Sequence, residues 1–274
     1  MPFADCLRSG RFAVALEITP PLRPSPGVLL RRARLIGDCA QAINVIQRPS
    51  RQSSLDASIE LRAAGIEPVW HLAVRGSSRD GLASDIARAR ESGIHNVLCL
   101  RGDHNAADLP DTPSIREAVQ MVVEGIPGAL AGATLNQYAP DDAAVLRNLL
   151  PKLRAGASYT QTQPVFDLAR ILPLADRVHS ASPDTRIVAM VMPLLTLHSL
   201  VRFEARLGIA LGEPVRSRVQ AGEASAWEFF QEVVAGLVAS PLVDGIAIMT
   251  FERDAPKPVG ERIATVLRAA GALS

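Results

Sequence analysis

The chain has 274 residues, 48% of them apolar, which is enough for one large hydrophobic core. Its 29 lysines and arginines nearly balance 28 aspartates and glutamates, which argues against a broad nucleic-acid-binding surface, although a local basic groove would escape this count. No apolar run approaches the roughly 20 residues of a membrane span, and the N-terminal residues lack the apolar core of a signal peptide. We therefore expect a cytoplasmic protein with no nucleic-acid or membrane partner.

Short apolar runs alternate with segments of helical periodicity along the whole chain, a pattern typical of strands that are each followed by a helix. Additional helical sequence lies before the last run. The predicted strands are 12–18, 42–46, 67–72, 96–103, 128–135, 158–163, 186–193 and 245–252.

Eight such alternations predict an α/β fold, a (β/α)8 TIM barrel, with a helical insertion before the last strand. No flexible linker divides the chain, so we expect a single domain over residues 1–274. A doubly wound open sheet is the alternative. It usually has fewer strands, and no G-x-G-x-x-G follows the first predicted strand.

The three cysteines, Cys6, Cys39 and Cys99, form no Cys-x-x-Cys pair and are expected to be buried thiols in a reducing compartment. Cys99 lies inside an apolar run, which favours an inert core residue over a nucleophile. The histidines are scattered and show no metal-ligand spacing, so we expect no metal site.

Polar residues stand at the predicted C-terminal strand ends, where a barrel carries its catalytic groups. These residues are Glu17, His71, Arg101, Asp103, Gln161, Gln163, Thr250 and Arg253. Singly, His71 has an alternative as a core histidine, Asp103 as a helix cap and Gln163 as a partner of loop backbone. Their convergence on one face of the barrel predicts an active site there.

Glu17 stands inside the apolar run FAVALEI, and a carboxylate is costly to bury unless it is paired or functional. An apolar barrel mouth would raise its pKa and make it a general acid near neutral pH. The alternative is a structural salt bridge with an arginine of the same mouth.

At these residues the sequence resembles the flavin-dependent methylenetetrahydrofolate reductases. The resemblance is carried, in the family's order and spacing, by LEITPP, PVWHLAVRGSSRDGLASDI, GIHNVLCLRGD, LPKLRAGASYTQTQPVFD and VMPL, and it covers essentially the whole chain. L-R-G-D alone is a weak motif. Its combination with A-G-A…T-Q-P-V-F-D and an early E-x-x-P-P is specific.

The resemblance implies a homo-oligomeric enzyme of one-carbon metabolism and methionine biosynthesis. FAD would lie along the C-terminal strand ends, NADH or NADPH would reduce it, and hydride would pass to 5,10-methylenetetrahydrofolate to give 5-methyltetrahydrofolate. It also implies catalytic roles for Glu17 (general acid), Asp103 and Gln163. The implied cofactor contacts are His71, Leu100, Arg101, Gly102, Asp103, Asn136 and Lys152. The implied substrate contacts are Gln163, Leu197 and Arg253.

Four positions depart from the family pattern. Ile46 replaces a flavin-contacting hydroxyl, Asn136 stands near a tyrosine position and Val145 replaces an aspartate at the ribose or adenine end of FAD. Leu197 replaces an aromatic platform for nicotinamide and folate. These changes keep alternatives open: a folate- or flavin-binding subunit that depends on a partner in a methyl-transfer complex, a flavin-free reductase that uses NADH directly, or a methyl transfer to or from a pterin without redox chemistry.

Overall fold

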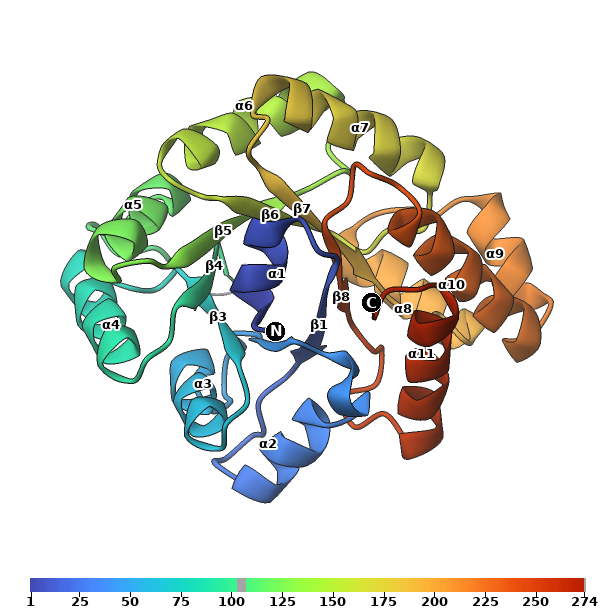
Figure 1. Ribbon diagram of the computed structural model, residues 1–274, viewed down its shortest axis with the longest axis horizontal. Coiled ribbons are helices and arrows are strands. Elements are labelled where there is room, and N and C mark those ends of the chain that lie inside the picture. Colours follow the sequence, from blue (N-terminus) through green and yellow to red (C-terminus); the bar gives the residue numbers. More distant parts are fainter. Residues whose placement is uncertain (103–106, 274) are drawn as a thin grey trace.

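The computed structural model describes residues 1–102 and 107–273, and its eight strands form one closed parallel barrel in chain order (Figure 1). The predicted (β/α)8 barrel is confirmed. The strands are β1 (Ala13–Ile18), β2 (Ala42–Val45), β3 (Pro68–Ala73), β4 (Asn96–Leu100), β5 (Leu130–Leu135), β6 (Tyr159–Thr162), β7 (Arg186–Val191) and β8 (Gly245–Ile248).

Helices surround the barrel, and the predicted insertion before the last strand is confirmed as α8, α9 and α10, grouped on one side of the ring (Figure 1). The helices are α1 (Phe3–Ser9), α2 (Pro26–Ala33), α3 (Ser54–Ala63), α4 (Arg79–Glu91), α5 (Ile115–Gly125), α6 (Asp142–Arg154), α7 (Leu168–Ala181), α8 (Leu197–Leu207), α9 (Glu213–Gln220), α10 (Glu223–Val238) and α11 (Lys257–Ala269), with a 3-10 turn η1 (Gly37–Cys39).

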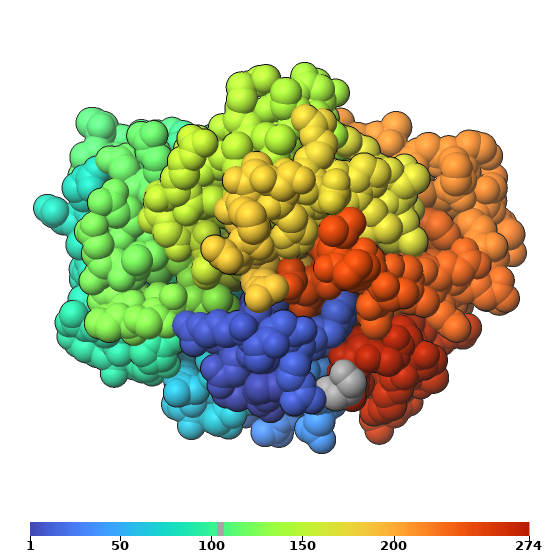
Figure 2. Space-filling view, turned by 45° about the horizontal axis from the view of Figure 1, so that its top comes forward, coloured from blue at the N-terminus to red at the C-terminus, as the bar shows by residue number. Residues whose placement is uncertain are grey.

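Helix α1 lies across the N-terminal end of the barrel, where Figure 1 shows it in blue at the centre of the ring of strands; Figure 2 shows the blue N-terminal segment on the surface of the molecule. Phe3, Cys6 and Leu7 of α1 are buried against the inward-facing residues of the strands. The Phe3 ring meets the Tyr159 ring edge-on, with centroids 6.2 Å apart. The sequence pattern did not predict this helix. It closes one end, so a ligand that enters the barrel approaches from the C-terminal strand ends.

Parallel register fixes which side chains share the interior. Glu17 of β1 pairs with Asn44 of β2, and Thr134 of β5 pairs with Gln161 of β6. Ala13 and Ala15 belong to the inner cluster, and side chains alternate along a strand, so Glu17 also faces inward.

Within the described residues, no helix is both long and apolar enough to cross a bilayer, and no group of three or more His, Cys, Asp or Glu side chains is placed to hold a metal ion. All three cysteines are free and buried, as expected.

Gly132 supplies a test of the packing inside the barrel. A Cβ atom at this position would lie 2.2 Å from the Tyr159 ring, so Gly132→Ala forces the ring or the strands to move. We expect a loss of about 1–3 kcal/mol in the free energy of unfolding, measured by urea denaturation. Gly27→Ala in α2 is the control, since nothing lies within 4 Å of that Cβ and alanine favours a helix. Equal unfolding midpoints for Gly132→Ala and the parent would contradict this packing.

Candidate active site

Three polar side chains from three strands meet inside the barrel: Glu17 of β1, Asn44 of β2 and Gln161 of β6. Asn44 Nδ2 donates to Gln161 Oε1 at 2.7 Å, and both side chains are buried. Gln161 also hydrogen-bonds Glu17. Because the Gln161 oxygen is engaged by Asn44, its amide N–H groups are directed to the Glu17 carboxylate. Asn44 therefore orients Gln161, and Gln161 positions Glu17.

Burial raises the pKa of Glu17 from its ordinary 4.5 to about 7, while the charge of Arg48 and the Gln161 hydrogen bond act in the opposite direction. A carboxyl group with this pKa is protonated in a large fraction of molecules at neutral pH and ionises readily. It therefore has the acid strength of an efficient general acid or base.

Glu17 opens onto a cavity of about 1130 Å³ at the C-terminal ends of β1, β2 and β8. Thr19, Ile46, Arg48, Thr250 and Arg253 line it near the strand ends. Side chains of α2, α8 and α11 extend the lining outward. The cavity is large enough for a drug-sized or cofactor-sized ligand beside Glu17.

An ion-pair cluster holds one wall of this cavity. Arg32 of α2 donates from Nε and Nη2 to the two carboxylate oxygens of Asp254, at 2.9 and 2.7 Å, and from Nη1 to the Thr19 carbonyl at 2.6 Å. Arg31 adds a bond of 3.0 Å to Asp254. The hydrogen bond from Arg32 is the main reason that the pKa of Asp254 falls to about 2. The loops after β1 and β8 are thereby tied together across the cavity.

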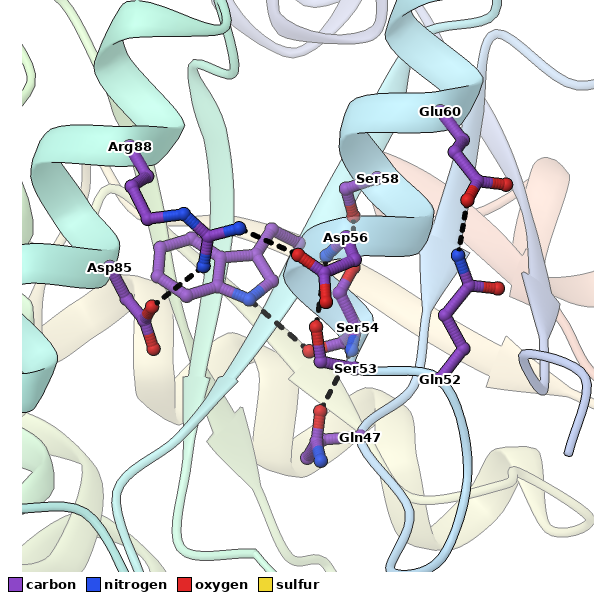
Figure 3. Close-up of polar contacts among 10 residues, drawn as sticks. Gln47, Gln52, Ser53, Ser54, Asp56, Ser58, Glu60, Asp85 and Arg88 are labelled. Carbon is purple, nitrogen blue, oxygen red and sulfur yellow. Dashed lines mark hydrogen bonds and ion pairs between the residues drawn. The ribbon is translucent and has the colours of Figure 1, made fainter. Parts of the chain in front are cut away.

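A second polar cluster orders the loop after β2, which carries Arg48 (Figure 3). Gln47 Oε1 accepts from the Ser54 backbone N–H at 2.8 Å, and Ser53 caps α3 by accepting from the Asp56 N–H. Gln52 Nε2 donates to Glu60 at 2.6 Å. The loop that brings Arg48 to Glu17 is thus anchored at both of its ends.

The same cluster anchors β3 and the neighbouring helix. Ser54 Oγ donates to the His71 carbonyl at 2.9 Å and accepts from the Trp70 indole at 3.2 Å. Figure 3 also shows Arg88 of α4 between Asp56 and Asp85, with bonds of 2.6 and 3.2 Å. The backbone at His71 is therefore fixed from the outside of the barrel.

His71 faces the interior, because its register partner Leu98 and its neighbour Val69 two residues earlier belong to the inner cluster. Burial lowers the pKa of His71 to about 3, so the imidazole is neutral at pH 7. Its Nε2 atom is buried and has no hydrogen-bond partner among the described residues. A polar ligand atom at this position would satisfy Nε2.

The other predicted cofactor contacts lie at or next to the ends of β4 and β5. Arg101 is exposed and pairs with Asp108, and Gly102 has a φ of 96°. Asn136 is exposed after β5. Lys152 of α6 is buried; its Nζ donates to the Thr134 carbonyl at 3.4 Å and also bonds Asn148.

Leu100 ends β4 and is half-buried, next to the predicted contacts Arg101 and Gly102. Asp103 lies outside the described residues. None of the described cofactor candidates lines the large cavity; His71 lines a smaller cavity of about 360 Å³ between the loops after β2 and β3.

Only one of the three predicted substrate contacts lines the large cavity. Arg253 lines the large cavity with Glu17. Gln163 follows β6, and its backbone is held by Gln137, whose Oε1 accepts from the Gln163 N–H at 3.0 Å and whose Nε2 donates to the Gln163 carbonyl at 2.7 Å. Leu197 begins α8 and is 42% exposed. Neither Gln163 nor Leu197 lines this cavity.

Sequence reasoning missed Asn44, Arg48 and most of the arginines around the cavity. The signal for Asn44 was present, since an amide interrupts the apolar run AINVI. The arginines of α2 and α8 gave no signal, because basic residues on helices are ordinarily solvated.

Sequence comparison identifies similar proteins. The sequence model of the family described as "Methylenetetrahydrofolate reductase" matches residues 3–259. The 5,10-methylenetetrahydrofolate reductase of Pectobacterium carotovorum subsp. carotovorum is 29% identical over 156 residues, which are 56% of this chain and 52% of that protein. Methylenetetrahydrofolate reductase 1 of Schizosaccharomyces pombe is 24% identical over 64% of this chain and 32% of its own length. The matched region thus spans about half or less of these relatives.

Among solved structures, a Clostridium thermocellum protein that binds two copies of 5-methyl-5,6,7,8-tetrahydrofolic acid superposes with a TM-score of 0.70. It covers 98% of both chains at 11% sequence identity. This likeness shows the fold alone.

Gln161→Leu tests how the site sets the acidity of Glu17. Loss of an amide hydrogen bond to the charged carboxylate should raise the pKa of Glu17 by about one to two pH units, as followed by NMR titration of carboxyl-labelled glutamate. Gln163→Leu is the control, because Gln163 lies two residues further along the same segment and does not contribute to the pKa of Glu17. If the pKa of Glu17 were the same in Gln161→Leu as in the parent, Gln161 would not be the residue that lowers it.

Glu17→Gln tests the cost of burying this carboxyl group. Between about pH 4.5 and 7 the folded protein retains a proton that the unfolded chain has released, so the stability contributed by Glu17 falls as pH rises through this window. Relative to the parent, Glu17→Gln should therefore gain about 2 kcal/mol between pH 5 and pH 7.5, after allowance for the part of the side chain open to solvent. Urea unfolding at the two pH values measures the gain, and a constant difference between parent and variant would contradict the raised pKa.

Proposed function

Because the chain belongs to the methylenetetrahydrofolate reductase family, we propose that it reduces 5,10-methylenetetrahydrofolate to 5-methyltetrahydrofolate. The observation that carries the proposal is Glu17, a carboxyl group with a pKa of about 7 at the edge of a large cavity. The Clostridium thermocellum protein of the same fold, which binds 5-methyltetrahydrofolic acid, supports a folate in a barrel of this kind.

Glu17 acts as the general acid. It donates its proton to N10 of the substrate, the bond between N10 and the bridging methylene carbon breaks, and a methylene iminium remains at N5. A hydride then adds to the methylene carbon, which becomes the N5-methyl group. Solvent reaching the cavity returns a proton to Glu17. The reaction consumes one hydride and one proton.

Gln161 and Arg48 limit the cost of this proton transfer. Both lower the pKa of Glu17, so both stabilise the carboxylate that remains after the proton has left. Burial alone would hold the proton too tightly, and a fully solvated carboxyl group would have lost it before the substrate arrived.

The folate would lie with its pterin beside Glu17 and its p-aminobenzoyl end toward Arg253, which lines the same cavity. Gln163 and Leu197 would contact the substrate from the ends of β6 and α8, and Asp103 would bind the pterin. These three assignments rest on the family pattern.

The residues that would hold a cofactor are His71 and the predicted contacts at the ends of β4 and β5. The unpartnered Nε2 of His71 is available to a ring atom, and Arg101 and Lys152 supply positive charge for a diphosphate. Leu100, Gly102 and Asn136 complete the residues that would hold FAD. FAD, when bound, supplies the hydride and is reduced by NADH or NADPH.

A second candidate is direct hydride transfer from NADH without a flavin. Val145 favours it, because this residue is 3% exposed and packs in the hydrophobic core. The large cavity beside Glu17 also favours it, because none of the described residues expected to contact FAD lines that cavity. An absorption spectrum of the purified protein between about 300 and 550 nm separates the two candidates. A flavin band that NADH bleaches and methylenetetrahydrofolate restores identifies the flavoprotein, whereas turnover by a colourless protein without added FAD identifies the direct route.

Glu17→Gln should reduce folate turnover by about 10²- to 10⁴-fold, because the amide keeps the shape of the side chain but has no acidic proton. The dissociation constant for 5-methyltetrahydrofolate should change by less than about threefold, since the chemistry rather than the fit is removed. Stopped-flow and equilibrium binding measure the two quantities. If a flavin is present, its reduction by NADH in the absence of folate should keep its rate.

Glu91→Gln is the matched control, since Glu91 is exposed at the end of α4. Full turnover in Glu17→Gln, or an equal collapse of flavin reduction and folate reduction, would show that Glu17 is not the general acid.

A further inference from the structure

We propose that Gln137 is a positioning residue of the active site, which fixes the backbone of Gln163 and so the place where the Gln163 side chain meets the substrate. This inference rests on the proposed function, because it takes Gln163 to contact the folate. Gln137 lies in the loop after β5 and is 3% exposed, and Gln163 follows β6, the neighbouring strand of the barrel (Figure 1). The hydrogen bonds that join these two segments carry the inference.

The loop after β5 turns so that Gln137 reaches the end of β6. Asn136 Oδ1 accepts from the Tyr138 N–H at 3.1 Å, and the Asn136 carbonyl accepts from the Ala139 N–H at 3.2 Å. A bond from an asparagine side chain to the backbone two residues further on forms a tight Asx turn. Gln137 is the residue enclosed by this turn, and its side chain is buried beside the end of β6.

The Gln137 amide continues the pairing of β5 with β6 for one step beyond the strands. The backbone pairing itself ends with a bond from the Gln163 N–H to the Leu135 carbonyl at 3.1 Å. Gln137 Oε1 accepts from the same N–H at 3.0 Å, and Gln137 Nε2 donates to the Gln163 carbonyl at 2.7 Å. A primary amide has both a donor and an acceptor, as a peptide group has, so one side chain holds both polar groups of the Gln163 backbone.

The backbone groups that Gln137 reaches do not need it to be satisfied. The Gln163 N–H also has its bond to β5, and the Gln163 carbonyl also accepts from the Thr162 hydroxyl at 2.7 Å. Gln137 Nε2 lies 3.2 Å from the Pro164 carbonyl as well, and that carbonyl accepts from the Tyr138 hydroxyl at 2.7 Å. Each of these groups would keep one partner if the Gln137 amide were lost. This redundancy indicates that the amide fixes a position and is not required for the barrel to form.

The side chain of Gln163 is left available to a ligand. Its amide makes no hydrogen bond with any group of residues 1–102 or 107–273, whereas its backbone N–H and carbonyl have two partners each. A donor and an acceptor carried on a fixed backbone meet a substrate with little loss of conformational freedom, and a small displacement of that backbone would misplace both. Gln137 therefore acts on the substrate through Gln163.

Loss of the amide should lower turnover and leave the protein folded. Gln137→Leu and Gln137→Met occupy similar space without the amide, and circular dichroism verifies that they fold. We expect kcat/KM for methylenetetrahydrofolate to fall by about 10- to 100-fold, because a misplacement of about 1 Å can reduce a rate by about 10²-fold. The midpoint in the pH dependence of kcat should stay at that of the parent, since Gln137 does not contribute to the pKa of Glu17.

A double-mutant cycle with Gln163→Ala distinguishes positioning from general support of the fold. If Gln137 acts through the Gln163 side chain, Gln137→Leu should change kcat/KM, and the dissociation constant of 5-methyltetrahydrofolate, by less than about twofold in the Gln163→Ala background. Tyr138→Phe is the matched control. It removes the neighbouring bond to the Pro164 carbonyl and leaves both polar groups of the Gln163 backbone held, so kcat/KM should stay within about twofold of the parent.

Equal losses in the parent and Gln163→Ala backgrounds would show that Gln137 supports the fold in general, and an unchanged kcat/KM in Gln137→Leu would show that it positions nothing. Either result overturns the inference. If Gln163→Ala keeps the turnover of the parent, Gln163 is not a substrate contact, and the inference fails while the proposed function stands. If the parent neither binds nor turns over methylenetetrahydrofolate, the proposed function fails and the inference fails with it.

Discussion

A carboxyl group held inside a closed barrel is the constraint on which the site depends. Glu17 of β1 points into the interior of the barrel, where burial raises its pKa to about 7. The charge of Arg48 and the amide of Gln161 act in the opposite direction and reduce that shift. Gln161 in turn is oriented by Asn44 from the opposite side of the barrel. Because the three side chains come from three strands, their geometry is available only when the barrel is closed.

Two polar clusters outside the barrel hold the loops that surround Glu17. The bonds of Arg32 to Asp254 and Thr19 tie the loop after β1 to the loop after β8, while Gln47 and Ser54 order the loop that carries Arg48. Neither cluster contains a residue with a proposed catalytic role. Each fixes the backbone from which an acidic or basic group reaches the cavity, so the acidity of Glu17 depends on hydrogen bonds well away from it.

The sequence was sufficient for the parts of the structure that follow from local pattern. Seven apolar runs and the segment SYTQTQ predicted the eight strands, and a glutamate inside an apolar run predicted a buried carboxyl group of raised pKa. The contact between Asn44 and Gln161 joins residues 117 positions apart, and no local pattern encodes it. Helix α1 was not predicted because seven residues are too few for helical periodicity to be recognised. In the structure its Phe3 and Leu7 side chains are almost completely buried. Most of the arginines around the cavity escaped prediction because they lie on three different helices, α2, α8 and α11, and each looks solvated on its own helix.

The arginines around the cavity and the buried acid place opposite demands on one small region. Cations near Glu17 lower its pKa and so favour loss of the proton that the reaction needs, and Arg48 already acts in this way. Carboxylates bound among those cations would offset part of their field. A bound anion would therefore raise the protonated fraction of Glu17, and its departure would favour the carboxylate again. In this arrangement the charges around the cavity also adjust the acidity of the carboxyl group at its edge.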